Sequence, residues 1–309
     1  MKSNNPSGFF GLAAVAAVAS AASIASGQLF TENFSDGNAA SRWGSAYQLE
    51  SSRDISTGPD GLVNFAFDYS TLGIASPTGS GDTIGAAIGV NLTDQTGDEG
   101  ESYIIYPLGR SFSGSFSVQA DMYVYNDGLA GSTELGMAGL FLNNSAPVAP
   151  YQWGTEGGPL AWIYSGEGGS SADLARFSEG NASSTGYLSL GDYNALPAGT
   201  IPGFQTGVSG SLGPAVDNAS GAWVKVRIEV DGSDVNYYLN DALVNTYDNS
   251  GGFYTEGNIF FGLTDPFNSA NAGNRAIIDN VLVQVVPEPS ALALGLLGLV
   301  SIWAVRRRQ

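Results

Sequence analysis

The sequence predicts an all-β protein, a sandwich or jelly roll built from about a dozen short strands. Apolar and polar residues alternate with a period of two in many short segments, which is the pattern of half-buried strands. Clusters of Gly, Asn, Asp and Ser separate these segments, and glycine supplies 43 of the 309 residues, roughly twice its usual share. No stretch of the body places apolar residues at the helical period, so we expect strands and turns there.

The clearest predicted strand is residues 115–125, whose apolar side chains point one way and whose polar side chains point the other. The segment from Trp223 to Tyr247 predicts a three-strand meander, because turn residues separate its alternating runs at 231–234 and at 240–241. Residues 165–220 are rich in Gly, Ser, Pro and Asn, so we expect long loops there, with short strands only at 175–177 and 187–190. The other predicted strands are 30–34, 62–69, 86–92, 102–107, 135–142, 160–164, 258–263 and 276–285.

Residues 1–27 are predicted to form a secretory signal helix that is removed on export. Lys2 precedes an apolar, alanine-rich stretch from Phe9 to Ala22. Small residues follow and offer cleavage sites after Ala25 and after Gly27. The alternative is an N-terminal membrane anchor that is retained.

Residues 287–309 have the composition of a sorting or anchoring tail. Pro287 and Pro289 end the last predicted strand, because proline has no backbone N–H for a sheet. An apolar run without charge follows at 291–305, and after it come Arg306, Arg307 and Arg308. About 15 helical residues reach roughly 24 Å, so the predicted transmembrane helix is short for a bilayer core of about 30 Å. The arginines place its end on the cytoplasmic side.

Val286-Pro287-Glu288-Pro289, the apolar helix and the arginine cluster together resemble the PEP-CTERM sorting signal of Gram-negative bacteria. The resemblance covers only this C-terminal segment. It implies transient anchoring in the membrane, recognition and cleavage near Pro-Glu-Pro by an exosortase, and delivery to the cell surface or an exopolysaccharide matrix. The alternative is an ordinary C-terminal membrane anchor in which Pro-Glu-Pro occurs by chance.

The remaining body, residues 28–286, is predicted to be one β-sandwich domain that is strongly acidic. It carries seven positive residues against 28 acids, a net charge of −21. Nucleic acid is therefore excluded as a partner, because its phosphates are neutralised by Lys and Arg. The chain has no cysteine and no histidine, so the fold is held without disulfides and the commonest general base and metal ligand is missing.

Four features of the body together resemble concanavalin A-like (laminin G-like) jelly-roll domains. They are Phe34-Ser35-Asp36-Gly37 with Trp43, the Trp223–Tyr247 meander, Phe261-Gly262-Leu263, and Ile278-Asp279-Asn280-Val281. The resemblance covers most of the body and rests on pattern, with no strict motif. It implies a two-sheet sandwich in which the first and last strands pair.

The search for catalytic groups leaves only carboxylates. Nucleophilic triads need His or Cys in their usual versions, and a glycosidase needs two carboxylates aimed at one cleft. The nearest approach to the Glu-x-Asp-x-Glu pattern of jelly-roll glycosidases is Glu229-Val230-Asp231, which lacks a third acid. We interpret these two acids as solvated charges at a strand end, and we predict no catalytic residue.

Two oxygen-rich loops are candidates for calcium, which related jelly rolls often bind. Neither loop has the spacing of a recognisable calcium motif, so the alternative is that both are simply solvated. The first loop carries Asp94, Asp98, Glu99 and Glu101, and the second carries Asp265, Asn268, Asn271 and Asn274.

Sugar binding would use exposed aromatic rings that stack on pyranose faces. Tyr151, Trp153 and Trp162 lie near Gly- and Pro-rich loops and are the candidates. The alternative is that they pack in the core, where we also expect Trp43 and Trp223.

These observations favour a non-catalytic surface or exopolysaccharide-matrix protein that binds polysaccharide or has a structural role. The first alternative is a carbohydrate-active enzyme that uses carboxylates only. The second alternative is an ice- or surface-binding protein, which would require flat Thr-rich repeats, and the sequence shows no such repeats.

Overall fold

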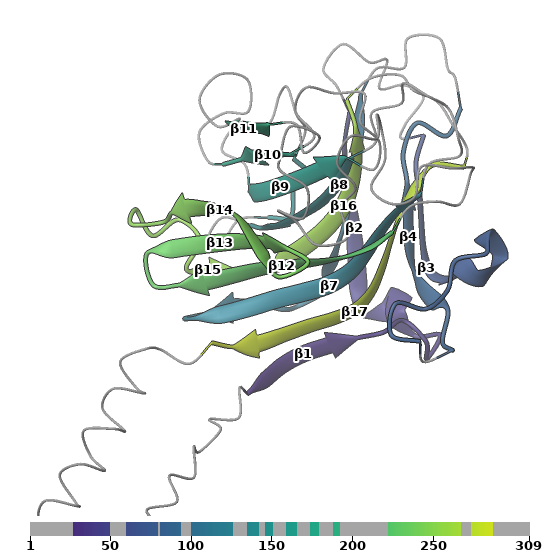
Figure 1. Ribbon diagram of the computed structural model, residues 1–309, viewed down its shortest axis with the longest axis horizontal. Helices are drawn as coiled ribbons and strands as arrows, with labels where there is room; N and C mark the ends of the chain where they lie inside the picture. Colours follow the sequence, from purple (N-terminus) through teal and green to yellow (C-terminus); the bar gives the residue numbers. More distant parts are fainter. Residues whose placement is uncertain are drawn as a thin grey trace, which may run out of the picture.

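The computed structural model describes residues 27–49, 60–79, 81–93, 100–125, 135–141, 146–150, 159–165, 174–178, 188–191, 222–266 and 273–286. These residues form an eight-stranded and a seven-stranded antiparallel sheet, which face each other as two layers, and a two-stranded ribbon (Figure 1). The predicted all-β sandwich is therefore confirmed.

The eight-stranded sheet has the order β14-β13-β12-β7-β17-β4-β3, and β1 also pairs with β17. The first and last described strands thus lie side by side (Figure 1), with Gln28 opposite Gln284. This confirms the pairing that the resemblance to concanavalin A-like domains implies. The strands are β1 (Gln28–Glu32), β3 (Leu62–Asp68), β4 (Ile84–Gly89), β7 (Phe116–Tyr125), β12 (Trp223–Asp231), β13 (Asp234–Leu239), β14 (Ala242–Asp248) and β17 (Arg275–Val285).

The seven-stranded sheet has the order β11-β10-β9-β8-β16-β5-β2. Its strands are β2 (Trp43–Leu49), β5 (Glu101–Pro107), β8 (Leu135–Leu140), β9 (Leu160–Ser165), β10 (Leu174–Phe177), β11 (Leu188–Gly191) and β16 (Ile259–Asp265). The ribbon pairs β6 (Phe112–Ser113) with β15 (Glu256–Gly257). Every predicted strand coincides with an observed one to within a few residues at each end, whereas β2, β6 and β15 were not predicted.

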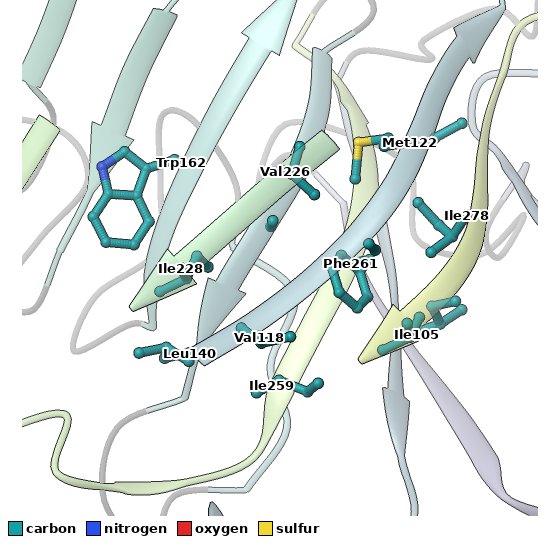
Figure 2. Close-up of a cluster of buried hydrophobic side chains, with 14 of the residues drawn as sticks. Ile105, Val118, Met122, Leu140, Trp162, Val226, Ile228, Ile259, Phe261 and Ile278 are labelled. Carbon is teal, nitrogen blue, oxygen red and sulfur yellow. The ribbon is translucent and has the colours of Figure 1, made fainter. Parts of the chain in front are cut away.

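The main core fills the space between the two sheets and consists of inward-facing side chains from both of them. Figure 2 shows Val118, Met122, Val226, Ile228 and Ile278 of the eight-stranded sheet with Ile105, Leu140, Trp162, Ile259 and Phe261 of the other sheet. Trp43 also belongs to this core, as predicted, and is 2% exposed. Burial on this scale can hold a β-sandwich together without disulfides.

The outward faces of the two sheets differ in chemistry. The outer face of the seven-stranded sheet is apolar and buried, with Ile104, Met137, Ile163 and Phe260 in one cluster that also contains Ala149. The outer face of the eight-stranded sheet carries polar side chains along β7, β12 and β17, and it is the face that holds the surface cleft described below.

The described part of the chain contains two short 3₁₀ helices, η1 (Ala39–Ser41) and η3 (Tyr69–Leu72). None of its helices is long and apolar enough to cross a membrane. The predicted signal helix before residue 27, the sorting motif Pro287-Glu288-Pro289, the transmembrane helix and Arg306, Arg307 and Arg308 lie outside the described residues.

Candidate functional site

A polar cleft of about 850 Å³ lies on the outer face of the eight-stranded sheet. Its floor comes from β7, β12 and β17, and its sides come from β1, the segment after it, and the loop around Pro77. The uncharged hydrogen-bonding side chains that line it are Gln28, Thr31, Asn33, Thr78, Gln119 and Asn280, and the charged ones are Glu32, Asp36, Arg42, Asp121 and Lys225.

The floor of the cleft is shaped by a β-bulge in β17. Asp279 stands opposite Asp121 of β7, but Leu282 stands opposite Gln119, so two residues of β17 face one residue of β7. Asn280 takes up the extra residue with a φ of 51°, a conformation that Asn adopts more readily than most residues. Its side-chain Nδ2 donates to Asp121 Oδ2 over 2.9 Å, so the bulge joins the two strands at the bottom of the cleft.

Asp279 and Asp121 share one face of the sheet because they are directly opposite in an antiparallel pair. Burial, together with the negative charges of Asp82 and Asp121, raises the pKa of Asp279 to about 6. Hydrogen bonds from the Asn280 N–H and the Tyr69 hydroxyl work in the opposite direction. The site therefore contains a carboxyl that is protonated at mildly acidic pH.

Of the two opposed acids, Asp121 is the one that lines the cleft. Burial raises its pKa, while the hydrogen bond from Asn280 and the charge of Lys225 oppose the rise. Asp279 lies behind it and is only 3% exposed. The pair is thus divided into one cleft-facing acid and one buried acid.

The cations of the cleft rim are already engaged by carboxylates. The Arg42 guanidinium donates Nε and Nη2 to Glu32 over 2.8 and 3.0 Å, and Nη1 and Nη2 to Asp36 over 2.9 Å each. These bonds hold the pKa of Asp36 down at about 2. Lys225 Nζ donates to Asp241 Oδ2 over 2.6 Å. Arg42 and Lys225 are therefore both held in place by ion pairs.

The segment 69–79 forms one wall of the cleft and is held by two hydrogen bonds from aromatic residues. The Tyr69 hydroxyl donates to Asp279 Oδ2 over 3.0 Å, and Trp223 Nε1 donates to the carbonyl of Ala75 over 2.7 Å. The rings of Tyr69 and Trp223 also meet edge to face, with centroids 5.2 Å apart. This packing places the two wall residues Pro77 and Thr78 on the cleft.

The raised pKa of Asp279 predicts a pH-dependent stability. The folded chain keeps the proton of Asp279 up to about pH 6, whereas the unfolded chain releases it near pH 4, so the free energy of unfolding is expected to fall as pH rises between these values. In Asp279→Asn a neutral oxygen still accepts from Tyr69. This variant should be more stable than the parent by about 1 to 2 kcal/mol at neutral pH.

Urea unfolding at pH 4.5 and at pH 7.5 measures this effect. Asp248→Asn is the matched control, because Asp248 is an exposed acid whose pKa is lowered by hydrogen bonds from Ser250. Its contribution to the pH dependence of stability therefore lies in the range below pH 4. If the free energy of unfolding changed equally with pH in the parent and in Asp279→Asn between pH 4 and 6, the raised pKa of Asp279 would be contradicted.

The structure brings together one residue from each predicted calcium loop. Glu101 and Asp265 stand directly opposite each other on β5 and β16, and both are fully buried. The two Glu101 carboxylate oxygens accept the backbone N–H groups of Asp60 and Asn91, and Asp265 Oδ2 accepts Asn91 Nδ2 over 3.0 Å.

Three of these four carboxylate oxygens thus accept N–H donors, and no group of three acidic ligands occurs among the described residues. Calcium binding by these loops stays a prediction, because most of the proposed ligands lie outside the described residues. Asn274 is described and buried. The remaining predicted ligands, which lie outside the described residues, are Asp94, Asp98, Glu99, Asn268 and Asn271.

Trp162 was predicted as a surface residue for sugar stacking, and the structure corrects this. Its side chain is fully buried and stacks on Tyr237 with ring centroids 5.1 Å apart and an angle of 4° between the planes. The other two predicted aromatic residues, Tyr151 and Trp153, lie outside the described residues. Trp223, predicted to be core, is instead half-buried on the outer face of the eight-stranded sheet.

The sequence did not reveal the cleft residues as a site. A polar interruption within the apolar last strand, at Asp279 and Asn280, is the one local signal that pointed to them. An exposed aromatic residue outside the cleft was also missed. Tyr47 is 47% exposed, and its ring lies 5.7 Å from that of Tyr103 on the neighbouring strand.

Comparison with known proteins places the chain by its fold. No family model matches the sequence, and no curated protein matches it. A Bacillus subtilis protein of unknown function with a galectin-like fold is similar, with 10% identity, a TM-score of 0.48 and coverage of 85% of this chain and 98% of that chain. The carbohydrate-binding module CBM66 from Bacillus subtilis is also similar, with 16% identity and a TM-score of 0.36. The match covers 68% of this chain and 89% of that chain.

A third similar structure is the GH16 protein of the Bacteroides ovatus mixed linkage glucan PUL, in complex with the product G4G4G3G. It has 11% identity, a TM-score of 0.43 and coverage of 82% of this chain and 99% of that chain. At these identities and scores the likeness concerns the sandwich layout alone. The fold and the cleft thus define a class, a two-sheet β-sandwich with a polar surface cleft.

Proposed function

We propose that the protein is an exported surface or exopolysaccharide-matrix protein whose concanavalin A-like sandwich binds polysaccharide without catalysis. The observation that carries the binding role is the cleft, where six uncharged hydrogen-bonding side chains lie around the partly exposed Leu282. Amide and hydroxyl groups recognise sugar hydroxyls, and small apolar surfaces accept the C–H faces of the ring. The volume of about 850 Å³ is in the range of ligand clefts.

The export role is supported by the sequence at both ends of the chain. The predicted signal peptide at 1–27 and the resemblance of 287–309 to a PEP-CTERM signal agree in direction. The strands next to these segments, β1 and β17, pair with each other, with Gln28 opposite Gln284. Intact mass of the protein recovered from the host surface and medium tests this role. Loss of roughly the last 20 residues is expected, and a mass that retains Arg306 to Arg308 would overturn it.

The binding role predicts that cleft variants lose affinity for polysaccharide. Thr31→Ala combined with Gln119→Ala removes two uncharged hydrogen-bonding groups of the cleft, one on β1 and one on β7. Each lost hydrogen bond costs about 1 kcal/mol, so the dissociation constant should rise roughly 30-fold. Affinity electrophoresis of the folded chain in gels that contain soluble polysaccharides measures this change.

Tyr47→Ala is the matched control, because Tyr47 is an exposed aromatic residue that does not line the cleft. It should leave binding unchanged within about twofold. Loss of binding in Tyr47→Ala with full binding in the cleft variant would move the site to the Tyr47–Tyr103 pair. Loss in neither variant would remove the cleft from the proposal.

A carboxylate-only enzyme is the second candidate, because Asp121 and Asp279 stand opposite each other with raised pKa values. Glycosidases use such a pair on either side of the bond that is cleaved. Here the buried position of Asp279 and its bond from Tyr69 favour the non-catalytic role. Reducing-sugar release that disappears in Asp121→Asn would support the enzyme instead.

A further inference from the structure

We propose that the cleft selects uncharged polysaccharides and rejects anionic ones, such as polymers of uronic acids or sulfated sugars. This inference rests on the proposed binding function and names the class of its ligand. It follows from how the charges of the cleft are already paired and from the sign of the charge that remains.

The first step concerns Arg42, the guanidinium on the cleft rim. Four of its N–H donors point at Glu32 and Asp36, with donor–acceptor distances from 2.8 to 3.0 Å. A guanidinium has five N–H donors in a fixed fork. An incoming carboxylate or sulfate would therefore have to displace an existing bidentate pair to form one of its own.

The second step concerns Lys225, the other cation that lines the cleft. Its ammonium group donates to Asp241 over 2.6 Å, and it also stabilises the charge of Asp121 on the cleft floor. An anionic sugar would compete with both carboxylates for this one cation. The cleft thus contains no cation, among its described lining residues, that is without a carboxylate partner.

The third step is the remaining charge. The lining residues include three acids, Glu32, Asp36 and Asp121, against Arg42 and Lys225. Asp241 adds a further negative charge at the edge, and Asp279 stands behind the floor. Like charges within a Debye length, about 10 Å at moderate salt, repel an anionic chain. The neutral amides and hydroxyls that line the same cleft carry no such cost for an uncharged chain.

The test compares neutral polysaccharides with carboxymethylated derivatives of the same backbone, so that only the ligand charge changes. A panel of β-glucan, mannan and galactan is used in affinity electrophoresis of the full chain at low salt. We expect at least one neutral polysaccharide to retard the protein and its carboxymethylated form to bind at least about tenfold more weakly. The difference should shrink in high salt, where charges are screened.

Asp36→Asn supplies the decisive variant. It removes one negative charge and releases Arg42 donors toward the cleft, while Glu32 still holds the guanidinium in place. Binding of the carboxymethylated polysaccharide relative to binding of the neutral one should increase several-fold. Asp234→Asn is the control with the same charge change, because Asp234 is the exposed first residue of β13, opposite Asp231 and at the far end of β12 from Lys225.

The outcomes distinguish the proposed polysaccharide binding from the charge selection inferred here. If no polysaccharide of either kind binds, the proposed binding function fails and this inference fails with it. If the carboxymethylated form binds as well as the neutral form, the binding function stands and the charge selection is wrong. If Asp36→Asn and Asp234→Asn behave alike, the selection does not come from the Arg42 cluster and the inference is likewise overturned.

Discussion

Trp162→Ala is expected to lower the free energy of unfolding by about 3 to 5 kcal/mol, because it would remove a large aromatic side chain from the centre of the sandwich. Trp162 belongs to the seven-stranded sheet and stacks on Tyr237 of the eight-stranded sheet at 5.1 Å. Its Nε1 also donates to Asn245 Oδ1 on β14 over 3.1 Å. One side chain thus joins the two layers by both packing and a hydrogen bond.

Urea unfolding followed by far-UV circular dichroism measures the loss without relying on tryptophan fluorescence. Trp162→Phe should lower the free energy of unfolding by less than Trp162→Ala does. It keeps a ring that stacks on Tyr237 and removes only the outer part of the side chain and the hydrogen bond to Asn245. Leu243→Ala is the control, because Leu243 is 57% exposed and should change stability by less than about 0.5 kcal/mol. A loss in Trp162→Ala as small as that of the control would contradict its central place in the core.

The strands with one polar face gave the clearest signal in the sequence. β7 and β12 alternate because their outer side chains belong to the polar face of the eight-stranded sheet. β8 and β16 are buried on both faces and were recognised only as apolar runs. β2 was missed because its apolar and polar residues do not alternate regularly. Ser45 is among its inward-facing residues, and Ala46 packs against the outer apolar cluster.

The candidate site could not be predicted, because it depends on strand order and register. Asp121 and Asp279 meet only because β7 and β17 are neighbours and a bulge fixes their alignment. Arg42 joins the same cleft from a segment near the start of the body. The sequence-based search for paired acids considered neighbours along one strand, such as Glu229 and Asp231, whereas the pair in the structure lies across two strands.

Gly139→Val is expected to destabilise the fold by about 3 kcal/mol or more, because it would add a branched side chain where there is no room for one. A Cβ on Gly139 would lie 2.3 Å from the carbonyl oxygen of Leu160 and 2.3 Å from the Phe260 ring. The ring itself is held by Phe141, with centroids 4.8 Å apart. Ala66→Val on the exposed face of β3 is the control and should be nearly neutral.

A second variant can separate the two contributions to this loss of stability, because one contact of Gly139 is with a side chain and the other is with the backbone. The Phe260 ring can be reduced to leucine, but the carbonyl of Leu160 belongs to the β8–β9 ladder and cannot be removed. If the ring is the main obstacle, Gly139→Val with Phe260→Leu should cost less than the sum of the single variants, with a coupling of about 1 kcal/mol or more. Strict additivity would instead assign the loss to the backbone contact. A Gly139→Val variant within about 0.5 kcal/mol of the parent would contradict the close packing of β8, β9 and β16 altogether.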